Sequence, residues 1–204
     1  MAFGKPGRPP EDRLARQREI YEAVSPLIYR DGARRLSMRD AASAACLSIG
    51  GLYHYFPNKR DLVLHGLRDD ARARICQGYR ARIADLAAWS VEAYVELYLE
   101  LCLEMFGFVR PAVLAALELG VEEFQAQLAA GLTTNVTELA ETLHQLAPDI
   151  PQSELERLGR GIRRIVLGTL VDRDADLREM QEQARALIEG HLASARQSAL
   201  VAIA

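Results

Sequence analysis

The sequence predicts an all-α protein in which a small N-terminal three-helix domain precedes a larger C-terminal helical domain. Apolar residues recur every three or four positions along most of the chain, the spacing that buries one face of a helix. No segment shows the apolar-polar alternation of a half-buried strand. Ser, Asn and Asp residues stand before several apolar segments, where they can cap helices. We expect a flexible basic arm over residues 1–9, a helix-turn-helix domain over 10–57 and a helical domain over 58–204.

The composition is that of an ordinary globular protein of 204 residues, with half of them hydrophobic and a net charge of -3. No apolar run approaches the ~20 residues that a membrane-spanning helix needs, and the N-terminus lacks the apolar region of a secretory signal. Cys46, Cys76 and Cys102 are odd in number and widely spaced, which argues against a disulfide framework. We therefore expect a cytoplasmic protein with buried thiols; a redox-sensing cysteine is the alternative.

Charge is distributed unevenly along the chain. Residues 1–60 contain 11 Lys and Arg against 6 Asp and Glu, whereas residues 61–204 contain 14 against 22. A basic segment on an acidic body is typical of a protein in which one region meets a polyanion. A chance imbalance is the alternative.

The arm cannot be helical because glycines and prolines interrupt residues 2–10. Lys5 and Arg8 make it basic, and Gly7-Arg8-Pro9 resembles the core of segments that insert Arg into a narrow DNA minor groove. A disordered tail without a role in binding is the alternative.

The first two helices of the N-terminal domain have recognisable ends. We expect the first to begin at Pro10, to kink at Pro26 and to end at Asp31, where a glycine follows. The second begins after Ser37, whose hydroxyl can cap the helix while the carboxylate of Asp40 reaches back.

The third helix runs from Ile49 to Tyr55, with Ser48 as its cap and Pro57 as its stop. Residues 37–55 thus have the lengths of a helix-turn-helix, whose second helix fits the DNA major groove. Ordinary helical hairpins share these lengths, so the spacing alone does not decide between them.

The C-terminal domain is helical throughout. We expect helices over about 58–82, 89–107, 111–130 and 134–146, one more beginning at Ser153, and a last one whose apolar residues include Leu177 and Met180. Ser153 and Glu156 have the spacing of a capping box. One acidic stripe on the helix over 89–107 consists of Glu92, Glu96, Glu100 and Glu104.

The segment SMRDAASAACLSIGGLYHYFPNKRDL, residues 37–62, resembles the DNA-binding domain of TetR-family transcriptional regulators. The LYHYF run, the Pro-Asn-Lys that follows and the acid-Leu pair are the most specific part, and the resemblance extends over roughly residues 10–65. It implies a homodimer that binds double-stranded DNA at a pseudo-palindromic operator and responds to a small-molecule effector. It also implies contacts to phosphates and bases from Ser37, Arg39, Ser48, Ile49, Gly50, Gly51, Tyr53, His54 and Lys59, to which the arm would add Lys5 and Arg8.

Three positions depart from the family pattern. Cys46 replaces the turn glycine, so a left-handed turn would carry strain. Ala41 replaces an aliphatic residue and thins the core of the domain. The recognition tip is Ile49-Gly50-Gly51, which offers few hydrogen-bonding groups, so we expect base reading to depend on Arg39 and on Arg8 of the arm.

The last two helices carry apolar stripes at heptad-like steps, which favour a symmetric dimer through four helices. A stripe buried within the monomer is the alternative. The expected interface residues are Leu158, Ile162, Ile165, Val166, Thr169, Met180, Ala184, Leu187 and His191. By resemblance, an effector pocket would be lined by Tyr94, Tyr98, Cys102, Met105, Phe124 and His144, unless these residues are simply core.

No pattern for a metal, a cofactor or catalysis is complete. Asp172, Asp174 and Asp176 imitate a calcium loop, but its glycine and closing glutamate are missing, which favours helix capping. The expected function is therefore that of a cytoplasmic, non-enzymatic, sequence-specific DNA-binding regulator, a repressor released by a small hydrophobic effector. The alternatives are a sequence-neutral architectural DNA-binding protein and, with less support, an all-helical carrier or enzyme.

Overall fold

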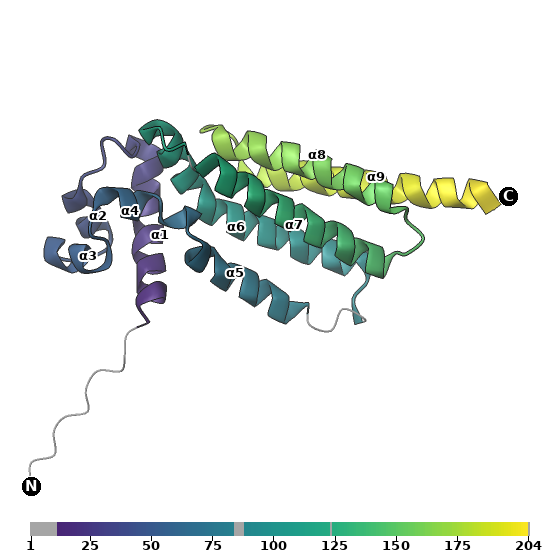
Figure 1. The fold of residues 1–204 in the computed structure, drawn as a ribbon, viewed down its shortest axis with the longest axis horizontal. Coiled ribbons are helices and arrows are strands. Elements are labelled where there is room, and N and C mark those ends of the chain that lie inside the picture. Colours follow the sequence, from purple (N-terminus) through teal and green to yellow (C-terminus); the bar gives the residue numbers. More distant parts are fainter. Residues whose placement is uncertain (1–11, 84–87, 123, 204) are drawn as a thin grey trace, which may run out of the picture.

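The computed structural model describes residues 12–83, 88–122 and 124–203. The expected basic arm, with Lys5 and Arg8, lies outside these residues. Figure 1 shows a small head of helices α1 to α4 at one end of an elongated body. In the body, α6 and α7 lie in the middle, α8 and α9 run along one long side, and α5 runs along the other. The described residues form helices and loops without a strand, as the sequence predicts.

The head consists of α1 (Arg13–Asp31), α2 (Met38–Ala44), α3 (Ile49–Tyr55) and the short α4 (Lys59–Val63). Each helix has a side-chain cap at its N-terminus, since Asp12, Ser37, Ser48 and Asn58 each accept a hydrogen bond from a backbone amide three residues on. The expected caps of α2, α3 and α4 are thus confirmed. The first helix has Asp12 as its cap, and Pro26 is accommodated within it.

The prediction of one helix from residue 58 to about 82 is wrong. The chain forms α4, a 3₁₀ turn over His65–Leu67 and then α5 (Asp69–Arg82). The break has a tertiary cause, because a Cβ on Gly66 would lie 2.6 Å from the Tyr21 hydroxyl and 2.7 Å from the Phe108 carbonyl oxygen. The close approach of α1 and α6 at Gly66 therefore sets the point where the head joins the body.

The prediction of separate helices over 89–107 and 111–130 is also wrong. One helix, α6 (Val91–Leu119), runs through Pro111, and it ends at Gly120, which has φ 68° and ψ 40°. More than half of its residues are buried, so packing on all sides offsets the hydrogen bond that proline removes. The next helix, α7, runs over Phe124–Leu146 and is longer than the expected 134–146.

The last two helices are α8 (Gln152–Val171) and α9 (Leu177–Ile203). The capping box expected at Ser153 does not form, because α8 starts one residue earlier and Pro151 precedes it. In the loop before α9, Asp176 Oδ1 accepts from the amide of Arg178, and Asp172 Oδ1 accepts from the amide of Asp174. These contacts fit the capping interpretation of the acidic loop.

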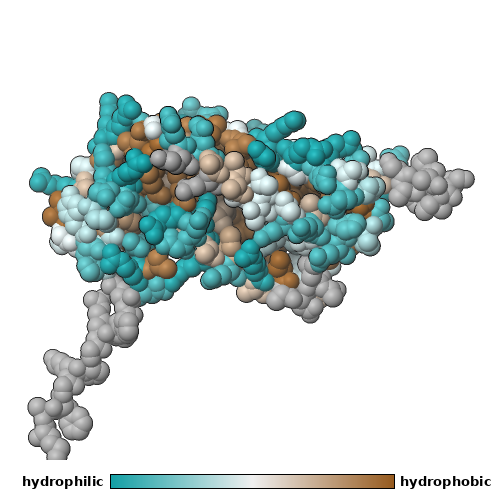
Figure 2. Space-filling view, viewed as in Figure 1, coloured by the Kyte–Doolittle hydropathy of each residue, from teal (hydrophilic) through white to brown (hydrophobic). Residues whose placement is uncertain are grey.

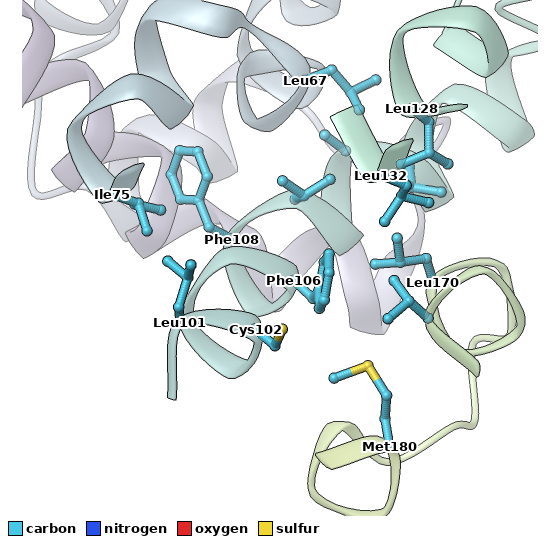
Figure 3. Close-up of a cluster of buried hydrophobic side chains, with 14 of the residues drawn as sticks. Leu67, Ile75, Leu101, Cys102, Phe106, Phe108, Leu128, Leu132, Leu170 and Met180 are labelled. Atoms are coloured by element: carbon cyan, nitrogen blue, oxygen red, sulfur yellow. The ribbon is translucent and has the colours of Figure 1, made fainter. Parts of the chain in front are cut away.

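The core of the body surrounds α6, which packs against α1, α5, α7, α8 and α9. Figure 3 shows part of this core, where side chains from several helices meet. On the face drawn in Figure 2, hydrophilic residues cover most of the surface and hydrophobic residues show between them. None of the helices in the described ranges is long and apolar enough to cross a membrane.

The acidic stripe of α6 connects the helices around it. Each of its four glutamates pairs with an arginine from a different place in the fold: Glu92 with Arg196, Glu96 with Arg185, Glu100 with Arg82, and Glu104 with Arg18. The partners come from α9, α5 and α1. The stripe is therefore a row of partly exposed ion pairs that fix neighbouring helices on α6, each contributing modestly.

Candidate DNA-binding surface and ligand pocket

The outer face of the head is formed by the N-terminus of α3 and by α2. Ile49 and Tyr53 are large hydrophobic residues that are 47% and 46% exposed. Gly50 has open space around it, since an added Cβ would meet nothing within 4 Å. Arg39 is exposed on α2. These residues are all accessible on α2 and α3.

Helix α3 is held on its inner side by α1. Arg13 Nη2 donates to the carbonyl oxygen of His54 at 2.8 Å, and Gln17 Nε2 donates to that of Tyr55 at 2.8 Å. Both acceptors belong to the last turn of α3, whose carbonyls have no partner within the helix. Leu52 and Phe56 are buried, which fixes the inner face of α3 on the head core.

The turn between α2 and α3 is left-handed, as the family pattern implies. Cys46 has φ 53°, the one positive φ at a residue other than glycine in the described parts of the chain. The amide of Leu47 donates to the carbonyl of Ala42 at 2.8 Å and closes the turn. The strain expected from the missing glycine is therefore present.

The expected DNA contacts differ in their local roles. Ser37 and Ser48 act as helix caps, so their hydroxyls are already engaged with backbone amides. Lys59 Nζ donates to the carbonyl oxygen of Arg34 at 3.0 Å and ties α4 to the loop between α1 and α2. Gly51 is half-buried beside Ser48, whereas His54 is exposed.

The same loop is fixed by a residue of the body. The two carboxylate oxygens of Glu118, on the last turn of α6, accept from the amides of Ala33 at 2.7 Å and Arg34 at 3.0 Å. Arg173 lies 4.0 Å from the same carboxylate and donates to the carbonyl of Tyr29. The end of α6 thus holds the segment that leads into α2.

The body contains a cavity of about 320 Å³ between α5, α6 and α7, within the size range of small-molecule sites. Its apolar lining includes Leu101, Phe106, Leu128 and Leu132, which Figure 3 shows among the buried side chains of the core. Its polar lining is Asp69, Arg72, Cys76, Gln77, Tyr79, Arg80, Thr134, Asn135 and Glu138.

The six residues expected to line a pocket are distributed differently. Met105 lines this cavity, and Phe124 lines a smaller one near α4 and α5. Tyr94, Tyr98 and Cys102 are buried in the core behind it. His144 is exposed and lies outside the cavity lining.

The buried tyrosines nevertheless support the cavity wall. Tyr98 Oη lies 2.6 Å from Asn135 Oδ1 and donates to it, and the hydroxyls of Tyr79 and Tyr94 are 3.0 Å apart. Burial raises the pKa of Tyr98 and of Tyr94 above the ordinary value, so both remain neutral hydrogen-bonding groups. Burial likewise raises the pKa of Cys102 to about 12, which leaves its thiol protonated.

Sequence reasoning missed the polar residues of α5 that line the cavity. Arg72, Cys76 and Arg80 recur at four-residue steps and therefore lie along one face of the helix. The sequence shows this spacing, but the same spacing is typical of a solvent-exposed helix face. The face of α5 that lines the cavity is determined by how α5 packs against α6 and α7.

Helix α5 also contacts the head. Arg74 forms an ion pair with Asp12, the cap of α1.

Helix α6 contacts α1 further along the chain, where Tyr21 Oη donates to the carbonyl of Phe108 at 3.1 Å. His65 is buried between the rings of Tyr21, Phe56 and Phe108.

The apolar stripes of α8 and α9 are largely occupied within the subunit. Leu158, Ile162, Val166, Met180 and Ala184 are at most 3% exposed, and Thr169 is also buried. Ile165, Leu187 and His191 are half-buried. Most of the residues predicted for a dimer interface are therefore buried within one subunit.

The head of α1 to α4 contains a helix-turn-helix formed by α2 and α3, and it stands on a larger helical body. Residues 20–65 match the sequence model described as bacterial regulatory proteins, tetR family. The match agrees with the resemblance seen in the sequence: over residues 20–65 the head is similar to the N-terminal domain of TetR-family regulators. A comparison with curated protein sequences finds no significant match.

Solved structures of bacterial transcriptional regulators share the fold over most of the chain. One from Mesorhizobium loti MAFF303099 is 16% identical and covers 90% of this chain and 98% of its own, with a TM-score of 0.54. One from Aquifex aeolicus VF5 is 17% identical, with 85% and 98% covered and a TM-score of 0.52. A third, from Streptomyces coelicolor, is 17% identical, with 92% and 89% covered and a TM-score of 0.50.

Proposed function

We propose that this protein is a ligand-responsive, sequence-specific DNA-binding repressor that a small molecule in the α5–α7 cavity releases from its operator. The observation that carries the proposal is the position of α5. One face of this helix lines the cavity through Arg72 and Cys76, and Arg74 of the same helix pairs with Asp12 at the start of α1. A ligand that moves α5 would therefore also move the start of α1, the helix that holds α3 in place.

The DNA side of the proposal rests on the exposed face of α3. Tyr53 and His54 are exposed and can contact phosphates, which position a protein on DNA without reading sequence. Arg39, exposed on α2, can form a bidentate pair with guanine. Ile49 can contact a thymine methyl group. Base reading would thus depend mainly on Arg39 and on the arm.

A homodimer would read two half-sites related by symmetry. The exposed residues of α8 and α9 support this assembly because their net charges differ in sign. Helix α8 exposes Arg157, Arg160, Arg163 and Arg164 against Glu156, whereas α9 exposes Glu179, Glu182 and Glu189 against Arg178 and Arg196. A symmetric pair can place α8 of each subunit against α9 of the other.

The dimer has a direct test. Sedimentation equilibrium of the full chain should give the mass of two subunits at low salt and a weaker association at high salt. Replacing Arg160 and Arg164 with glutamate should yield a folded monomer that binds a single half-site weakly. A monomeric mass for the unaltered protein at all concentrations would exclude a two-subunit repressor.

The alternative function is a sequence-neutral architectural DNA-binding protein. The N-terminus of α3 favours it, because Ile49, Gly50 and Gly51 offer few hydrogen-bonding groups for reading bases. Selection of bound fragments from genomic DNA distinguishes the two. A repressor should enrich one short pseudo-palindrome, and Arg39→Ala should lower its discrimination while Lys59→Ala weakens operator and scrambled DNA equally. A steep salt dependence with no enriched sequence would favour the architectural function.

A further inference from the structure

The α5–α7 cavity is apolar in the middle and charged at two ends. Its apolar lining comes mainly from α6 and α7, while α5 contributes two arginines. Arg72 and Arg80 are eight residues apart on one helix, so their α-carbons are separated by about 12 Å. A ligand in the apolar part can therefore present a polar group to one arginine without reaching the other.

The two arginines are in different environments. The side chain of Arg72 is 16% exposed, and its pair with Asp69 is to a carboxylate that is 95% exposed. The side chain of Arg80 is 61% exposed and pairs with Glu138 at 2.7 Å. Within the described parts of the chain, Arg72 is thus a largely buried cation whose single carboxylate partner lies in solvent.

The guanidinium of Arg72 has donors beyond the one that Asp69 engages. A guanidinium has five N–H donors. Asp69 engages Nη2, while Nη1 lies toward α7, 3.5 Å from the position that a Cβ on Gly131 would occupy. Because residue 131 is a glycine, no side chain fills this space.

A second donor lies one helical turn from Gly131. Asn135 also lines the cavity and accepts the Tyr98 hydroxyl through Oδ1. The amide nitrogen of Asn135 remains as a donor among the described contacts. Gly131 and Asn135 are four residues apart and lie on one face of α7, so guanidinium and amide donors border the same end of the cavity.

The acidic side chains in the cavity lining favour a singly charged anion over a doubly charged one. Asp69 and Glu138 line the cavity and would repel a dianion such as a phosphate monoester. A carboxylate carries one charge and matches the planar fork of arginine. The volume holds about ten groups of the size of a water molecule, at ~30 Å³ each.

From these features we propose that the cavity binds a medium-length apolar carboxylic acid as its anion, with the carboxylate on Arg72 and the hydrocarbon against Leu101, Phe106 and Leu128. The regulatory effect of this acid rests on the proposed function, whereas its binding to the cavity does not require DNA. The amide of Asn135 would be the second donor to the carboxylate.

Calorimetric titration of the full-length protein at pH 7 tests the proposal, with octanoate and octanamide as probes of equal heavy-atom count. Octanoate should bind at least about tenfold more tightly than octanamide, since the contact to Arg72 is charge-assisted. Arg72→Met, which keeps the apolar stem, should weaken octanoate by about tenfold and leave octanamide unchanged. Arg72→Lys should fall between, because an ammonium lacks the fork.

The matched control is Arg82→Met, which removes the same charge from the same helix outside the cavity lining and should change octanoate affinity by less than about twofold. Thermal unfolding of each variant verifies that it is folded. Equal binding of the two probes, no binding of octanoate, or an unchanged affinity in Arg72→Met would overturn the proposal.

Operator titrations separate this inference from the proposed function. Octanoate binding that depends on Arg72 and leaves operator affinity unchanged would support the ligand class and exclude release by that ligand. If octanamide releases the operator as effectively as octanoate does, the result would support the regulatory function and reject the role of Arg72.

Discussion

Arg74 of α5 forms an ion pair with Asp12, the residue that caps the N-terminus of α1. The next residue, Arg13, donates to the carbonyl of His54 in the last turn of α3. The hydrogen bond from Arg74 holds the pKa of Asp12 below its usual value. A helix that lines the cavity is thereby joined to α3 through two adjacent residues.

This connection predicts that Arg74→Gln weakens operator binding in the absence of ligand, by about threefold for a partly exposed pair. The cap loses its partner, and the first turn of α1 should open more often. Hydrogen exchange at the amide of Ala15, which donates to Asp12, should become faster. Arg82→Gln is the control, since it removes the same charge from α5 but pairs with Glu100 inside the body; equal losses in both variants would contradict the role of Arg74.

Glu118 provides a second connection between body and head. Its carboxylate accepts from the amides of Ala33 and Arg34, and removing it leaves two backbone donors without their acceptor. Glu118→Ala should lower the free energy of unfolding by about 1–3 kcal/mol. Chemical denaturation measures this loss. Glu100→Ala, which breaks an exposed ion pair, should lower it by less than about 1 kcal/mol, and a loss as large as that for Glu118→Ala would refute the explanation.

Much of the head could be predicted from sequence because its helix ends depend on local chemistry. Ser48 caps α3 and Asn58 caps α4 through bonds spanning three residues, which the sequence displays. The break at Gly66 could not be predicted, because its cause lies in Tyr21 and Phe108, far away along the chain.

The candidate site likewise has features that the sequence predicts and features that it does not. Exposure of Tyr53 and burial of Leu52 follow from the helical period of one short segment. The cavity lining depends on how three helices meet, and the period does not reveal which polar residues of α5 face inward. The same limit applies to α8 and α9, whose apolar stripes fit a dimer seam and a buried core equally well.

His65 predicts a pH dependence of stability. Burial among aromatic rings, with a smaller effect of Arg68, lowers its pKa from 6.5 to about 4, while Asp70 acts in the opposite direction. The folded state therefore binds fewer protons than the unfolded chain between these values, so stability is full above pH 6.5 and falls as the pH drops toward 4. The loss attributable to His65 is up to about 3 kcal/mol.

Denaturation curves between pH 7 and pH 4 measure this effect. His65→Phe has no titrating ring and should flatten the decline over that range, while His144→Gln, at an exposed position, should leave it unchanged. A decline of the same size in His65→Phe would assign the pH dependence to other groups.

The turn at Cys46 predicts a stabilising substitution. Its φ of 53° is a left-handed conformation that costs a residue with a Cβ roughly 1–3 kcal/mol and costs glycine little. Glycine also gains freedom in the unfolded chain, which offsets about 0.4–1 kcal/mol of the benefit. Cys46→Gly should therefore raise the free energy of unfolding by about 1 kcal/mol. Cys46→Ala removes the thiol but keeps the Cβ, so it should give no such gain, and equal stabilisation by both would show that the thiol, rather than the backbone, limits the stability of the turn.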